Sequence, residues 1–138
     1  MIPPVMEVLG VLMRWLHIAS AALLVGGVAY ARIVAVPVLR ILEDDERAAI
    51  WEQQTWRFQG VVYGAIAGLV ASGVYSFMLH AGHTRFYHAF FGIKMLLAAH
   101  LFATSILLIK EPKPSRMTSA AISGLLVILV AAYLRRIY

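Results

Sequence analysis

Residues 8–39 read VLGVLMRWLHIASAALLVGGVAYARIVAVPVL, an apolar run longer than the roughly 20 residues with which a helix crosses a bilayer. The first half of this run contains His17. An ionisable side chain in hydrocarbon costs free energy unless it finds a partner, so such residues usually mark a cofactor, ion or proton site. The run therefore predicts both a transmembrane helix and a polar site within it.

The composition of the whole chain points to the same class of protein. Hydrophobic residues make up 62% of the 138 residues, and the mean hydropathy is +0.81, which exceeds what a soluble core of this size needs. We expect an all-α integral membrane protein, a single-domain four-helix bundle with up-down-up-down topology over residues 1–138. The pattern predicts helices over about residues 5–41, 58–80, 87–110 and 117–136, with a short interfacial segment over about residues 43–57.

Basic residues gather at the ends of the apolar runs. The formal charge of +5 would suggest nucleic acid in a soluble protein, but here the basic side chains anchor to lipid headgroups, so the expected partner is the bilayer and not nucleic acid. More of them lie in the first and third connections than at the other end, which predicts extracytoplasmic termini in a bacterial inner membrane. Residues 1–12 contain Glu7 and no Lys or Arg, so we expect the first run to be kept rather than cleaved as a signal peptide.

The chain contains no cysteine, which limits the side chains that could bind a metal ion. This excludes thiolate metal sites, iron–sulfur clusters and covalent c-type haem attachment. Any metal must be held by His, Met, Lys, Tyr or carboxylate groups.

Three ionisable residues within the apolar runs suggest a haem site. His17 and Lys94 each lie just inside helices that begin on the same side, so they should share a depth, whereas His100 lies about 9 Å deeper than Lys94 and about 120° around the helix. A b-type haem between the first and third helices would use His17 as an axial ligand, with the other position taken by His100, taken by Lys94 or left open. Arg14 and Arg85 lie near the same face, where they could pair with the propionates. Alternatively, His17 bonds a backbone carbonyl and Lys94 extends to the interface.

A second group of histidines lies around the connection between the second and third helices. His80, His83 and His88 are spaced so that they could bind copper, particularly on the extracytoplasmic side. The alternative is that they are ordinary solvated side chains of a polar connection.

Small residues recur at every fourth position of the second predicted helix. Such a ridge lets a second backbone or a flat ligand approach closely, and helix packing alone would also explain it. Packing of small residues on the first two helices could also support a homodimer. The ridge consists of Gly60, Gly64, Gly68, Ser72 and Ser76.

Residues 15–27, WLHIASAALLVGG, resemble the first core helix of the copper-resistance-protein-D family, in which a histidine is followed by a Gly-Gly pair. They are also similar to HemJ-type protoporphyrinogen oxidases, small four-helix membrane proteins that bind haem b. In these proteins this histidine and a lysine on the third helix form the functional pair, so the resemblance implies that role for His17 and Lys94. Gly27, Tyr30 and Arg32 echo further residues of the HemJ-type first helix, the arginine at a slightly displaced position.

The chain departs from the HemJ-type pattern at three places. Leu24 and Gly92 replace a tryptophan and a second histidine, and the terminal Asn-Glu-x-Pro motif is missing. The resemblance therefore implies the superfamily and haem b more directly than porphyrinogen oxidation. We predict a membrane-embedded b-type haem-binding protein that acts in electron transfer or a related redox reaction, with a redox partner that no motif identifies. A copper-binding or copper-transport protein is the alternative, and a cofactor-free membrane scaffold is the third.

Overall fold

The computed structural model describes residues 2–79 and 85–136, and all its regular structure is helical. Four helical units are long and apolar enough to cross a membrane, which confirms the expected all-α four-helix bundle. The first unit bends through a π-helical turn. The elements are α1 (Pro4–Tyr30), η1 (Ala31–Ala35), α2 (Val36–Leu39), α3 (Asp44–Leu79), α4 (Arg85–Lys110) and α5 (Pro114–Arg136).

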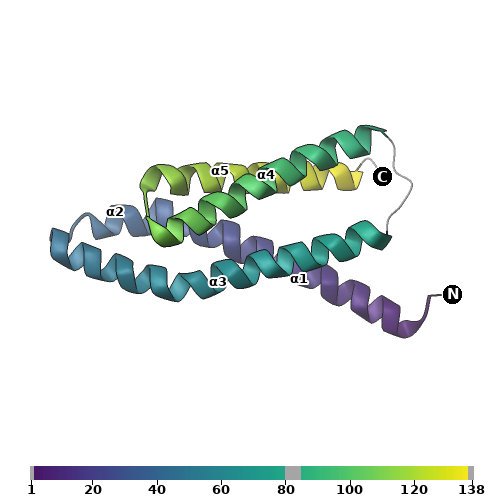
Figure 1. The fold of residues 1–138 in the computed structure, drawn as a ribbon, viewed down its shortest axis with the longest axis horizontal. Helices are drawn as coiled ribbons and strands as arrows, with labels where there is room; N and C mark the ends of the chain where they lie inside the picture. The colour runs from purple at the N-terminus through teal and green to yellow at the C-terminus, as the bar shows by residue number, and fades with distance from the viewer. Residues whose placement is uncertain (1, 80–84, 137–138) are drawn as a thin grey trace.

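The helices run alternately up and down, and α4 and α5 lie side by side, whereas α3 and α4 diverge toward the end where the chain connects them (Figure 1). α1 makes its main contacts with α3 and α5, while α4 packs on α5 and more sparsely on α3. α1 and α4 therefore face each other across the bundle. The N-terminal part of α1 extends away from the other helices (Figure 1), and its buried residues begin only at Ser20. The core is built from Leu24, Val28, Val62, Leu101, Met117 and Ala120, among others.

One continuous helix, α3, replaces the separate interfacial segment that we predicted over residues 43–57. No proline interrupts this stretch, and the acidic residues of its first turn favour the positive end of the helix dipole. Its 36 residues span about 54 Å, whereas the hydrocarbon core of a bilayer is about 30 Å thick. The charged first turns of α3 therefore extend beyond the hydrocarbon as a continuation of the spanning helix.

The π-helical turn η1 lies directly before Pro37. Proline has no N–H, and its ring would collide with the carbonyl four residues earlier in a regular helix. The helical turn contains one extra residue here, so the Val36 N–H donates to the Ala31 carbonyl, five residues earlier. Within this turn, the Arg32 Nε donates to Thr118 Oγ1 of α5 at 2.8 Å, so the wide turn is tied to a neighbouring helix.

The connection between α4 and α5 is held by charge pairs. Lys113 Nζ and Arg116 Nη1 lie 3.3 and 3.2 Å from the two carboxylate oxygens of Glu111. The hydrogen bond and positive charge of Lys113, with a smaller contribution from Arg116, hold the pKa of Glu111 below its usual range. Pro114 begins α5 where its missing N–H has no carbonyl to pair with.

The connection between α2 and α3 is organised by the side chain of Arg47. Its Nε donates to the Leu39 carbonyl at 2.9 Å and its Nη2 to the Leu42 carbonyl at 2.8 Å, while Nη1 lies 3.1 Å from Asp44 Oδ1. The carbonyls at the end of α2 lack helical partners, so the guanidinium acts as a C-terminal cap.

Arg47→Ala is expected to lower the free energy of unfolding by about 1–3 kcal/mol, because it leaves several carbonyls without a charged donor. Unfolding by SDS in mixed micelles measures this loss. Arg40→Ala removes an exposed arginine from the same connection and is the matched control, expected to change little. Full stability in Arg47→Lys would show that charge alone, and not the forked guanidinium, maintains the turn.

Candidate functional site

Close packing of α1 against α3 positions His17. A side chain at Gly68 would collide with Ser20 Oγ and approach Leu16 Cδ1 to 3.2 Å, so the two backbones meet at this level. The helices are antiparallel, so one turn back along α1 is opposite one turn forward along α3. This register brings His17 opposite Ser72.

Only the middle of the small-residue ridge takes part in this contact. Gly68 and Ser72 are buried, whereas Gly60, Gly64 and Ser76 are exposed. Each residue of the ridge lies about 40° further around the helix than the one four positions before it, so the ridge as a whole cannot face a single straight helix. Packing against α1 at the centre of the ridge therefore explains why Gly68 and Ser72 are buried.

His17 and Ser72 form a chain of two hydrogen bonds. Ser72 Oγ is fully buried, and it donates to the Gly68 carbonyl at 2.6 Å. His17 Nδ1 forms a hydrogen bond with Ser72 Oγ at 2.8 Å. In the tautomer that donates Nδ1–H to this hydroxyl, the lone pair of Nε2 is left for a metal ion or another donor.

Lys94 belongs to the same region of the bundle. It lies half-buried on α4, and His17 is half-buried on α1. The two residues therefore lie on helices that face each other across the bundle.

His100 is directed elsewhere. It is exposed on α4, and its Nε2 forms a hydrogen bond with Ser119 Oγ of α5 at 2.9 Å. The offset in depth and angle between positions 94 and 100 gives the two side chains different neighbours. The structure does not join His100 to the His17–Ser72 pair.

The remaining predicted site residues lie at the surface of the described chain or outside it. Arg14 and Arg85 are exposed, so each can reach headgroups or a ligand at the edge of the bundle. His88 is also exposed, with its ring edge-on to the ring of Tyr87. His80 and His83 lie outside the described residues. Within residues 2–79 and 85–136, no group of three or more His, Cys, Asp or Glu residues is placed to hold a metal ion.

Sequence reasoning missed Ser72 as the partner of His17. It placed the serine in the ridge and the histidine in the site without connecting them. The available signal was the antiparallel register, since Ser20 opposite Gly68 predicts His17 near Ser72. Using that signal requires knowing which face of each helix meets the other.

The fold and the site define a four-helix membrane bundle with a half-buried histidine bonded to a buried serine, and a half-buried lysine on the facing helix. No family model matches the chain, and neither a curated protein nor a solved structure matches it. The functional argument therefore depends on the residues themselves.

Proposed function

We propose that this chain is a membrane-embedded b-type haem-binding protein that acts in electron transfer or a related redox reaction, with His17 as an axial ligand of the iron. One observation carries the proposal: His17 Nδ1 forms a hydrogen bond with Ser72 Oγ, a fully buried hydroxyl that also bonds the Gly68 carbonyl. Metal-binding imidazoles almost always donate their second N–H to a fixed partner of this kind.

The donor set fits haem. Imidazole is a common haem iron ligand, and facing helices of a bundle are the usual source of ligands to a central cofactor. When bound, haem supplies a one-electron redox couple. Lys94 offers either a second protein ligand or a positive charge for a propionate. Its half-buried position on the helix that faces α1 supports it over His100, which is exposed and bonded to Ser119.

The setting of the site in the membrane is part of the proposal. Six basic residues lie in or next to the connections α2–α3 and α4–α5, against Arg85, Arg135 and Arg136 at the other end. This difference supports a cytoplasmic position for the two connections and extracytoplasmic termini in a bacterial inner membrane. The six are Arg40, Arg47, Arg57, Lys110, Lys113 and Arg116. The His17 site then lies nearer the extracytoplasmic face. The unburied N-terminal part of α1 would be the natural surface for a homodimer.

Optical spectra of detergent-purified protein test the proposal directly. The chain is expressed with a haem precursor, and oxidised and dithionite-reduced spectra are followed by a pyridine haemochrome assay. We expect sharp reduced α and β bands and one haem b per chain. A protein that stays colourless after reconstitution with haem would contradict the proposal, and retained copper after dialysis against a weak chelator would favour the copper alternative.

A further inference from the structure

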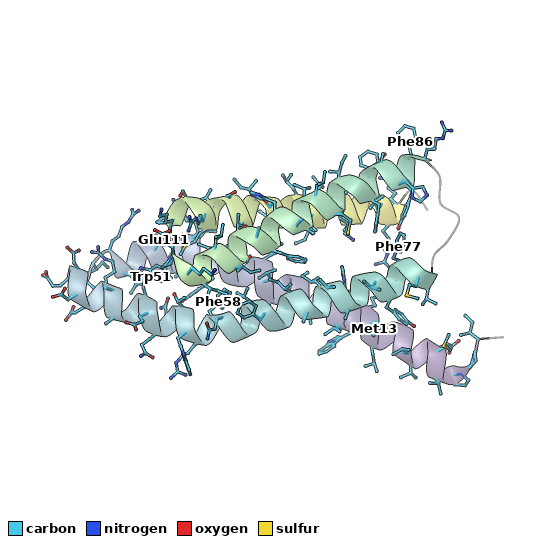
Figure 2. The ribbon with its side chains drawn as sticks, in the orientation of Figure 1. Met13, Trp51, Phe58, Phe77, Phe86 and Glu111 are labelled. Atoms are coloured by element: carbon cyan, nitrogen blue, oxygen red, sulfur yellow. The ribbon has the colours of Figure 1, made fainter. Side chains whose placement is uncertain are left out.

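A cavity of about 500 Å³ lies at the other end of the bundle from His17. It is bounded by the end of α1 with η1, by the first half of α3 and by the end of α4, and its lining is predominantly apolar. Aromatic side chains form part of its wall, namely Tyr30, Trp51 and Phe58. Figure 2 shows Trp51 and Phe58 at this end, near Glu111, and Met13 toward the opposite end. Cavities that bind small molecules measure roughly 300–1,000 Å³.

Ser105 is one of the polar residues in this mainly apolar lining, together with Gln54, Thr55 and Arg57. The residue is 1% exposed, and its Oγ has no hydrogen-bond partner among the residues that the structure describes. Helical hydroxyls commonly donate to the carbonyl four residues earlier, as those of Ser72, Thr104 and Ser123 do here. Ser105 departs from this pattern, and a buried hydroxyl without a partner is costly.

We propose that the cavity binds a lipid-soluble ring compound of the quinone class, whose carbonyl oxygen accepts a hydrogen bond from Ser105 Oγ. The aromatic wall suits a flat ring, and the carbonyl supplies the partner that Ser105 lacks. A fatty acid could place its carboxylate against Arg57, which also lines the cavity, but its alkyl chain would leave Ser105 unpaired. This assignment does not depend on haem at His17.

Tryptophan fluorescence tests the proposal, because Trp51 lines the cavity. The chain has three tryptophans, and Trp15 and Trp56 are 66% and 69% exposed, so Trp15→Phe with Trp56→Phe isolates the Trp51 signal at little structural cost. The detergent-purified chain is titrated with 2,3-dimethyl-1,4-naphthoquinone at fixed detergent concentration. We expect quenching that saturates, with about a three- to tenfold weaker affinity in Ser105→Ala, the loss expected for one hydrogen bond.

Two further variants keep the outcome interpretable. Ser105→Thr keeps the hydroxyl and is expected to retain binding, while Val61→Phe adds bulk at a cavity position that is 38% exposed and is expected to weaken it. Ser105→Ala removes an unpaired hydroxyl, so it should unfold no earlier than its parent. Quenching that never saturates, equal affinity in Ser105→Ala, or displacement of the naphthoquinone by laurate irrespective of residue 105 would overturn the proposal.

Discussion

Replacing His17 by alanine is expected to abolish haem retention, with loss of the reduced α and β bands from the purified protein. The imidazole is the proposed iron ligand, and as a ligand it would donate Nδ1–H to Ser72 and bind the iron through Nε2. Ser72→Ala removes that acceptor while leaving the ligand in place. A loss of about 10–100-fold in haem affinity is expected, the usual effect of removing such a supporting partner. Haem titration of the apo-protein measures both effects.

His100→Ala is the matched control, because His100 lies on α4 and bonds Ser119 of α5. It should keep the wild-type spectrum, as should simultaneous alanine substitution of His80, His83 and His88. Lys94→Ala should shift the spectrum if the amine binds the iron, and should change the affinity alone if it pairs with a propionate. Haem retention in His17→Ala together with its loss in His100→Ala would contradict the site as we assign it.

Gly124→Ala is expected to lower the free energy of unfolding by about 1–3 kcal/mol, the usual effect of forcing extra volume into a packed interface. A methyl group at this position would lie 2.7 and 3.0 Å from the two Cγ atoms of Val25. Both residues are buried where α1 meets α5. Valine is stiff at χ1, so the helices would have to separate. SDS-induced unfolding in mixed micelles measures the change.

Gly26, next to Val25 in α1, provides a control for this prediction. A side chain at Gly26 would meet nothing within 4 Å, so Gly26→Ala should leave stability unchanged or slightly raised, since alanine favours helix over glycine. The double variant Val25→Ala with Gly124→Ala should be more stable than the two separate losses predict, because the clash is removed. If the two stability losses simply add, the contact between residues 25 and 124 does not limit how closely α1 and α5 approach.

The sequence indicated a good part of the candidate site. Counting residues from the helix starts predicted that His17 and Lys94 lie at a similar depth, and the offset of His100 predicted that it could not meet the same atom as Lys94. What counting could not provide was the partner of each side chain. The bonds from His17 to Ser72 and from His100 to Ser119 depend on which helix faces turn toward each other.

The sequence by itself determined that this chain forms four apolar helices with ionisable residues among them, because hydrophobic length and composition are properties of each segment alone. Only the tertiary structure decided the pairing of His17 with Ser72 and of His100 with Ser119. Each of these pairings depends on the rotation and register of one helix against another. Those quantities are set by close contacts such as Gly68 with Ser20 and Gly124 with Val25, between residues far apart in the chain.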